Sequence, residues 1–329
     1  MTESVDVAQS ASKIAFIFPG QGSQAVGMGK ELFDTFPVAR QTFEEADEAL
    51  GYRLSQVCFD GPEEKLRLTE ITQPAILTVS IAAFRVLQQR VAKPSFVAGH
   101  SLGEYSAHVA SGTMTFADAV RTVRNRGKYM QEAVPVGVGA MAAILGMELE
   151  KVVAVCREAA QGEVCSPANI NSPEQIVISG NTAAVERGTK LADERGAKRA
   201  KLLPVSAPFH CSLMRPAQDR LRADLNALKT QRPMYPVVCN VEATLVMDQL
   251  RARDTLVAQV TGAVKWEQSM RLLIENGVQT FVEIGPGKVL CGLMRQIDRS
   301  KICLNVGDEA SLSKTLAQFG SQHMVRDFS

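Results

Sequence analysis

The sequence has few aromatic residues and no excess of charge of either sign. Phe, Trp and Tyr make up 5% of the 329 residues, and 36 Lys and Arg stand against 35 Asp and Glu, for a net charge of +1. Nucleic-acid-binding proteins normally carry a basic excess, so we expect no nucleic acid as a partner. An acidic protein partner would have to bind a local basic patch.

The sequence also has no hydrophobic run that would cross a membrane. The most apolar stretch, residues 74–84, is interrupted by Thr78 and Ser80 and ends at Arg85. It is well short of the roughly 20 residues that a spanning helix needs. The N-terminal MTESVDVAQSAS is polar and acidic and lacks the basic and apolar parts of a secretory signal. We therefore expect a cytoplasmic protein without membrane contact.

Cysteine pairs with the spacing of a metal or redox site are absent too. The seven cysteines, Cys291 and Cys303 among them, are scattered and odd in number. None is spaced from another as a metal-binding or redox-active pair. Free thiols in a reducing compartment are the simplest interpretation, and we expect no metal site.

The sequence does contain apolar runs that alternate with helical periodicity, which is typical of an α/β protein. The pattern predicts a buried strand at residues 13–19 (KIAFIFP), followed by the glycine-rich GQGSQAVGMG, and another at 95–99 (SFVAG). It predicts helices at 31–50, 74–90 and 115–133. The length allows one large domain or two of moderate size.

The pattern changes in the middle of the chain. It predicts, in chain order, a strand, a helix, two strands, a helix and a strand, at residues 139–145, 148–160, 164–170, 175–179, 182–195 and 198–205. This β-α-β-β-α-β order is that of a ferredoxin-like unit. We therefore expect a small subdomain at residues 135–206, inserted between the two parts of a larger α/β subdomain at 13–134 and 207–320. In the second part, strands are predicted near 237–239, 280–284 and 302–306, and residues 320–329 are predicted to be a loose tail.

A candidate nucleophile lies in the pentapeptide Gly99-His-Ser101-Leu-Gly103. It follows a predicted strand and opens a helix, and the glycines permit the tight turn that presents a serine at the end of a sheet. The helix N-terminus behind Ser101 would supply free N–H groups and partial positive charge for an oxyanion. Because this motif also recurs by chance, a serine that only forms a turn or caps a helix stays an alternative.

A candidate base follows by elimination among the four histidines. His100 adjoins Ser101, and neighbours on a tight turn tend to point apart. His108 is two helical turns away, about 10 Å along the axis, and His323 lies in the polar tail. This leaves His210, in a loop bracketed by prolines (PVSAPFHCSLM), whose alternative is a packed or helix-starting histidine.

The third member of a catalytic triad is not identified by this reasoning. In an α/β-hydrolase an acidic residue follows the serine and precedes the histidine. The acidic residues between Ser101 and His210 fall on predicted helix faces or in the inserted unit. A backbone carbonyl could orient the imidazole equally well, because fixing the tautomer needs only an acceptor.

The glycine-rich loop and one arginine are further candidates for the site. The loop fits a dinucleotide fingerprint poorly, since Gly20-x-Gly22 is followed by glycine only at Gly27. Gln21, between two glycines, could instead donate an N–H near the nucleophile. On the helix predicted at 115–133, Arg126 falls on the inner flank, where a charge needs a partner. A structural salt bridge and a ligand-binding role are equally compatible with that position.

Together, these segments resemble the malonyl-CoA:acyl-carrier-protein transacylases of fatty acid synthesis. The resemblance covers roughly residues 13–320, in the order FIFPGQGSQ, GHSLGEYSA, RNRGKYMQEAVP, PFH and EIGPGKVL. It implies an α/β-hydrolase-like core with a ferredoxin-like insert. It also implies a malonyl transfer from malonyl-CoA to the phosphopantetheine thiol of a small, acidic acyl carrier protein. The transfer would be a double displacement without metal or other cofactor, and we expect a monomer.

The resemblance also implies roles for individual residues. Ser101 would be acylated, with His210 as its base and the backbone carbonyl of Gln259 in place of the missing acid. The backbone N–H groups of Gln21 and Leu102 would form the oxyanion hole. Arg126 would bind the malonyl carboxylate in a two-pronged salt bridge. Phe209 would favour malonyl over methylmalonyl groups.

Two other functions compete with this interpretation. A serine esterase or thioesterase would share the serine motif but transfer the acyl group to water, and Arg126 and the absent acid count against it. A non-catalytic protein that binds a carrier would tolerate the loss of Ser101 or His210. Basic residues that could attract the carrier protein are Arg195, Lys198, Arg199 and Lys201, with Lys288 and Arg295 further along the chain; the alternative is an ordinary solvated surface.

Overall fold

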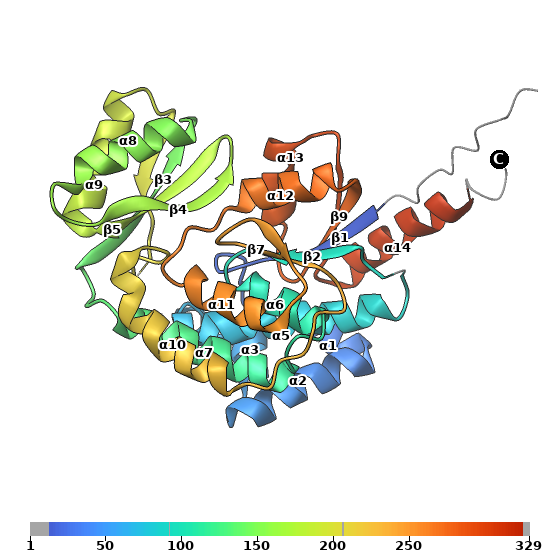
Figure 1. Ribbon diagram of the computed structural model, residues 1–329. Helices are drawn as coiled ribbons and strands as arrows, with labels where there is room; N and C mark the ends of the chain where they lie inside the picture. The colour runs from blue at the N-terminus through green and yellow to red at the C-terminus, as the bar shows by residue number, and fades with distance from the viewer. Residues whose placement is uncertain (1–12, 92, 206, 325–329) are drawn as a thin grey trace, which may run out of the picture.

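The computed structural model describes residues 13–91, 93–205 and 207–324, which form two β-sheets with helices around them (Figure 1). The strands are β1 (Lys13–Phe18), β2 (Phe96–Gly99), β3 (Gly139–Leu145), β4 (Cys165–Ser172), β5 (Gln175–Asn181), β6 (Arg199–Leu202), β7 (Val237–Cys239), β8 (Thr244–Val246), β9 (Val278–Ile284) and β10 (Ile302–Val306).

The helices before the second half of the chain are α1 (Lys30–Thr35), α2 (Pro37–Leu50), α3 (Leu54–Asp60), α4 (Glu63–Leu66), α5 (Thr69–Gln88), α6 (Gly103–Ala110), α7 (Phe116–Glu132) and α8 (Leu149–Ala160). The later ones are α9 (Thr182–Glu194), a 3-10 turn η1 (Ser212–Met214), α10 (Arg215–Ala227), α11 (Gln249–Gln259), α12 (Trp266–Glu275), α13 (Val289–Ile297) and α14 (Glu309–Met324).

The larger sheet has the strand order β10-β9-β1-β2-β7-β8 and is parallel except for the edge strand β8. Alternate residues of β1 serve its two faces, as the pleat of a strand requires. Phe16 and Phe18 pack in the core on the side of α5, whereas Ala15 and Ile17 pack with residues of α12 and α13. Both faces are therefore apolar, which explains why β1 reads as a continuous hydrophobic run.

The smaller sheet has the strand order β4-β5-β3-β6 and is antiparallel throughout. Its chain order is β3-α8-β4-β5-α9-β6, and α8 and α9 pack together on one face (Figure 1). Ile144 and Ile178 of the sheet share a separate core with Val152 of α8 and Val185 of α9.

The smaller sheet is joined to the larger part of the molecule along β4. Asn169 forms a parallel bridge with Val264, in which Ile170 N donates to Val264 O and Val264 N donates to Ala168 O. Ser172 Oγ donates to Gln296 Oε1 of α13 over 2.6 Å. The last residues of β4 therefore face the carboxyl ends of the parallel strands, where open α/β sheets bind ligands.

Most predicted elements are present within a few residues, and the differences have local causes. The helix expected at 31–50 is divided at Pro37, because the residue before a proline avoids the helical conformation; Phe36 is extended, with φ −116° and ψ 118°. The short strand β8 was not predicted, and β6 ends earlier than expected. The prediction of a loose tail is wrong for residues 320–324, which continue α14; residues 325–329 lie outside the described part.

The prediction of free thiols is wrong for one pair of cysteines. Cys291 in α13 and Cys303 in β10 form a disulfide, with their Cα atoms 5.5 Å apart. That separation is usual for a disulfide, and it arises because α13 packs on the strand beside it. A separation of 12 residues in the sequence gave no sign of this contact.

Helix α5 is long and apolar enough to cross a membrane by length and composition alone, but 89% of its most hydrophobic window is buried inside the protein. It begins before the apolar run at residues 74–84, and its additional first residues include the buried polar side chains of Thr69, Thr72 and Gln73. Helix α5 is thus the central helix under the larger sheet (Figure 1).

Candidate active site

Ser101 lies on a sharp turn between β2 and α6, as the sequence motif predicted. Its φ is +51°, a left-handed conformation that is uncommon for serine. A Cβ atom on Gly99 would lie 1.9 Å from the backbone of Gly103, so the turn can close only with glycine at that position. A Cβ on Gly20 would lie 2.4 Å from His100 O, which explains how the glycine-rich loop approaches the serine so closely.

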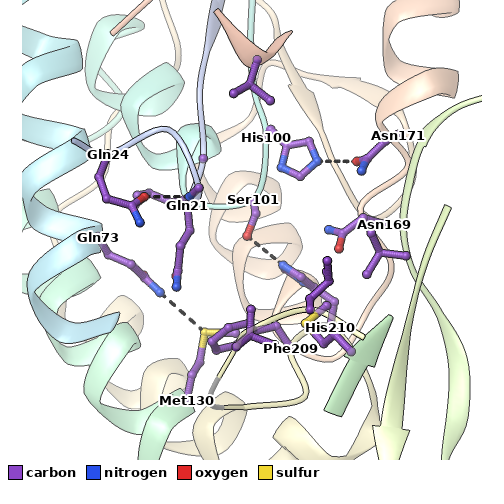
Figure 2. A pocket seen from close by; sticks show the side chains of 18 of the residues that line it. Gln21, Gln24, Gln73, His100, Ser101, Met130, Asn169, Asn171, Phe209 and His210 are labelled. Atoms are coloured by element: carbon purple, nitrogen blue, oxygen red, sulfur yellow. Dashed lines mark hydrogen bonds between the residues drawn. The ribbon is translucent and has the colours of Figure 1, made fainter. Parts of the chain in front are cut away.

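The side chains of Ser101 and His210 are in contact (Figure 2). Ser101 Oγ lies 2.7 Å from His210 Nε2, and His210 Nδ1 lies 2.9 Å from the backbone carbonyl oxygen of Gln259. The carbonyl can only accept, so Nδ1 carries the proton and Nε2 is free to accept from the serine hydroxyl. Burial, with the nearby charge of Arg126, lowers the pKa of His210 from 6.5 to about 3, so the imidazole is neutral at pH 7.

Arg126 reaches the same place from α7. Its side chain is buried, and Nη2 donates to Ser101 Oγ over 3.2 Å and to Gln259 Oε1 over 2.9 Å. Nη1 donates to Gln73 Oε1 over 2.8 Å. Burial lowers the pKa of Arg126. Among the described residues no carboxylate lies within ion-pair distance of this guanidinium, so it meets only neutral acceptors beside the serine.

The residues predicted to form an oxyanion hole, Gln21 and Leu102, both lie at the cavity that contains Ser101. Neither backbone N–H group donates a hydrogen bond to another residue in the described part of the chain. Leu102 is the residue before the first turn of α6, where N–H groups have no partner within the helix. The two groups are thus available to an oxygen bound beside Ser101.

The cavity has a volume of about 930 Å³ and lies between the two sheets. The larger part contributes Gln21, Arg126 and Phe209, and the ring of Phe209 points toward Met130 in Figure 2. The smaller sheet contributes Asn169 and Asn171 of β4. Such a cavity is large enough for an extended ligand that reaches the serine from the surface.

Neither His100 nor His108 forms a hydrogen bond with the Ser101 hydroxyl. His100 Nε2 lies 2.7 Å from Asn171 Oδ1, with its ring edge-on to Trp266, and burial lowers its pKa (Figure 2). His108 is buried in α6 beside Thr113. The side chain of His323 lies outside the described part. Of the histidines with described side chains, His210 is therefore the one that the fold brings to the serine hydroxyl.

Two residues of the site, Asn240 and Glu104, were not predicted. Asn240 Oδ1 accepts from Ser101 N over 2.6 Å, and its Nδ2 donates to Gly99 O over 2.7 Å. Asn240 directly follows β7, which pairs with β2 in parallel. Asn240 could have been predicted from its position, because it is a polar residue at the carboxyl end of a strand and that strand neighbours the one before the nucleophile. Glu104 accepts from the backbone N–H of Asn240 over 3.0 Å.

Of the basic residues that were predicted to attract a carrier protein, some already form ion pairs within this chain. Arg195 pairs with Glu158 over 2.5 Å, and Lys198 pairs with Glu174 over 2.8 Å. Arg199 and Lys201 are exposed on β6, which leads into the cavity wall at Leu203. Lys288 and Arg295 are exposed at α13. Among residues 13–324, apart from the two undescribed positions, no group of three His, Cys, Asp or Glu side chains could hold a metal ion.

Comparison with known proteins places these features in one family. The profile of the family described as acyl transferase domain matches residues 15–317. The "Malonyl CoA-acyl carrier protein transacylase" of Escherichia coli (strain K12) is 50% identical over 287 residues, which cover 87% of this chain and 93% of that protein. The protein with the same description from Bacillus subtilis (strain 168) is 48% identical, with 92% and 95% covered.

Solved structures agree over nearly the same length. An acyl carrier protein S-malonyltransferase from Vibrio cholerae has a TM-score of 0.91 and 48% identity, covering 92% of this chain and 100% of that one. A malonyl-transacylase in complex with a type II PKS acyl-carrier protein has a TM-score of 0.91 and 46% identity, with 93% and 100% covered. The α/β architecture described above is thus shared with these proteins.

Proposed function

The chain belongs to the acyl transferase domain family, among the malonyl CoA-acyl carrier protein transacylases, and we propose that it carries the malonyl group on Ser101 during the transfer. The observation that carries this proposal is that two functional groups contact the hydroxyl oxygen of Ser101. Ser101 Oγ lies 2.7 Å from a neutral imidazole and 3.2 Å from a buried guanidinium that has no carboxylate partner among the described residues.

The first half-reaction forms the acyl-serine. His210 Nε2 takes the proton of the Ser101 hydroxyl while Oγ attacks the thioester carbonyl carbon of malonyl-CoA. The N–H groups of Gln21 and Leu102 would stabilise the oxyanion of the tetrahedral intermediate. When the carbon–sulfur bond breaks, the imidazolium returns its proton to the sulfur, and coenzyme A leaves as the thiol.

The second half-reaction repeats these steps with a different thiol. His210 accepts the proton of the phosphopantetheine thiol of acyl carrier protein, and the thiolate attacks the acyl-serine carbonyl. The bond between carbon and Ser101 Oγ breaks, and Oγ recovers the proton from His210. The steps need only side chains and backbone groups of this chain, so we propose that no metal or organic cofactor takes part.

Arg126 would select the acyl group. A guanidinium can form two parallel hydrogen bonds with a carboxylate, and malonyl carries a carboxylate where acetyl has only a hydrogen. Phe209 would limit the width of the pocket beside the α-carbon. Gln259 would orient His210 through its backbone carbonyl, because that oxygen accepts from Nδ1 over 2.9 Å.

At the level of the fold, we propose that the larger part is an α/β-hydrolase-like core (residues 13–134 and 207–320) with a ferredoxin-like subdomain (135–206). The parallel strands β1, β2 and β7 around the serine turn support the first assignment, and the order β3-α8-β4-β5-α9-β6 supports the second. We also propose that the enzyme acts as a monomer in the cytoplasm.

A labelling experiment tests the acyl-serine. The enzyme is mixed with labelled malonyl-CoA, and the label is followed by mass spectrometry on the protein and then, after addition of the carrier protein, in solution. We expect a malonyl adduct on Ser101, none on a folded Ser101→Ala variant, and transfer to the carrier protein. An adduct on Ser101→Ala would refute the nucleophile, and release mainly as free malonate would identify a hydrolase.

A further inference from the structure

Glu104 is buried directly beneath the nucleophile, and the steps proposed above do not use it. It lies in the first turn of α6, and its side chain is completely inaccessible to solvent. Of its two carboxyl oxygens only Oε2 has hydrogen-bond partners, while Oε1 is buried and has none among the described residues. A buried and half-satisfied carboxylate costs stability, so its presence calls for a role other than stabilising the fold.

Both partners of Glu104 Oε2 hold the backbone of Ser101. The oxygen accepts from Asn240 N over 3.0 Å and from Gln259 Nε2 over 2.7 Å. The side chain of Asn240 bonds the turn on either side of the nucleophile, at Ser101 N and Gly99 O. Gln259 Nε2 also donates to Ser101 O over 2.9 Å. Ser101 is thereby held at both its N–H and its carbonyl in its left-handed conformation.

Gln259 extends this arrangement to the other two functional groups. Its Oε1 accepts from Arg126 Nη2, and its backbone oxygen accepts from His210 Nδ1, each over 2.9 Å. Asn240 and Gln259 come from separate segments, after β7 and at the end of α11, and both are completely buried. One oxygen of Glu104 thus connects the two residues that hold the serine, the histidine and the arginine.

We propose that Glu104 is a positioning residue that orients Asn240 and Gln259, and through them Ser101, His210 and Arg126. The inference rests on the proposed role of Ser101. It has a consequence for the oxyanion: because Asn240 occupies the N–H of Ser101, that group is unavailable to the intermediate, which must bind to Gln21 and Leu102. Displacement of a catalytic group by 1 Å can cost about 100-fold in rate, and this sets the expected size of the effect.

The test compares two substitutions of similar size. Glu104→Gln keeps an oxygen that can accept from Asn240 and Gln259, whereas Glu104→Met fills a similar space with only a weakly accepting thioether sulfur. Each variant is treated with a fluorophosphonate, which forms a bond from Ser101 Oγ to phosphorus and releases fluoride. This probe needs the serine and its base but no carboxylate-binding arginine. The rate of malonyl transfer is measured in parallel, with kcat and KM for malonyl-CoA determined separately.

We expect Glu104→Gln to label within about threefold of the unmodified enzyme. For Glu104→Met we expect about a 100-fold slower labelling and a kcat reduced by a similar factor, because the reacting groups are displaced. The KM for malonyl-CoA should change far less. Glu283→Gln is the matched control: Glu283 is equally buried and accepts from the N–H groups of Leu290 and Cys291, but it does not contact the serine turn.

Equal labelling of Glu104→Met and the unmodified enzyme would overturn the inference, and so would a Glu104→Gln variant as slow as Glu104→Met. If Glu104→Met does not fold, Asn240→Ala tests the same link, and an unchanged labelling rate there would overturn it equally. A lack of labelling at Ser101 in the unmodified enzyme would instead refute Ser101 as nucleophile, and the inference with it. The two failures are therefore distinguishable.

Discussion

Arg126 Nη2 lies 3.2 Å from Ser101 Oγ, so a buried cation contacts the hydroxyl oxygen that is proposed to attack the substrate. The arginine is also fixed by the amide oxygens of Gln73 and Gln259. These neutral acceptors orient the guanidinium without neutralising its charge. A malonyl carboxylate that exchanges for the serine contact would form the direct ion pair that Arg126 lacks among the described residues; the buried Glu104 acts on it only from a longer distance.

Arg126→Ala should reduce malonyl transfer far more than acetyl transfer, since only malonyl carries the second carboxylate. Truncation of a buried, hydrogen-bonded charge pair costs about 2–5 kcal/mol, which corresponds to a loss of roughly 30-fold or more in kcat/KM. The measurement is kcat/KM for malonyl-CoA and acetyl-CoA with the same variant. Arg126→Lys keeps the positive charge but cannot form two parallel hydrogen bonds with a carboxylate, so its kcat/KM for malonyl-CoA should lie between those of the unmodified enzyme and Arg126→Ala. Equal losses for both substrates would assign Arg126 a structural role.

Phe209→Ser should increase the use of methylmalonyl-CoA relative to malonyl-CoA. Phe209 lines the cavity that contains Ser101, and we predict that its ring occupies the space that an α-methyl group would need. A competition assay with both substrates gives the ratio of kcat/KM values. Phe209→Leu, which keeps most of the bulk, should change the ratio less. An unchanged ratio in a folded and active Phe209→Ser variant would contradict this steric explanation.

We expect His210 to remain an effective general base for the acylation of Ser101 at pH values below 6.5, the usual pKa of histidine. Because burial and the charge of Arg126 lower the pKa of His210 to about 3, the imidazole stays neutral, and able to accept a proton, as the pH falls below 6.5. We expect the kcat/KM for enzyme acylation to show no histidine titration between pH 5 and 8. This can be measured by rapid quenching over that range.

One control is needed for the pH profile. Burial also raises the pKa of Glu104 to about 7, so Glu104 could titrate in the same range. The profile is therefore repeated with Glu104→Gln. A decline below pH 6.5 that persists in this variant would show that His210 titrates normally, and would contradict the assignment of its lowered pKa.

The serine turn was predictable from the sequence because its constraints are local. Gly99 must be small for the chain to turn between β2 and α6, and Gly103 must be small because it lies against the backbone of Phe18 at the end of β1. Two glycines around a serine after an apolar strand are the sequence pattern that this turn requires. His210 followed from elimination among four histidines. Gln259 followed only from the family resemblance, since a backbone carbonyl can belong to any residue.

The rest of the site depends on contacts between distant segments. The position of Arg126 on its helix left a salt bridge and a ligand-binding role equally open, and only the packed structure gives its acceptors. Asn240 follows the strand predicted near 237–239, but the sequence did not show that this strand pairs with the strand before Ser101. The disulfide between Cys291 and Cys303 likewise depends on the packing of α13 on β10.

The final prediction concerns the exposed basic residues of β6. Arg195 and Lys198, which the sequence suggested as docking residues, already pair with Glu158 and Glu174. Arg199 and Lys201 are exposed, have no ion-pair partner among the described residues, and lie on the strand that leads to the cavity. They are therefore the better candidates to attract an acidic carrier protein.

Reversing these two charges in Arg199→Glu/Lys201→Glu should slow the transfer from malonyl-enzyme to carrier protein and make its rate less dependent on salt, because electrostatic steering acts on association. Acylation by malonyl-CoA should stay nearly unchanged. The control Lys301→Glu/Lys314→Glu alters the net charge equally, at the residue before β10 and in α14. Helix α14 lies on the opposite side of the molecule from the smaller sheet (Figure 1), and this control should leave both rates unchanged. If both half-reactions slow together, the residues attract phosphate groups generally and are not specific for the carrier; if neither slows, carrier docking does not use β6.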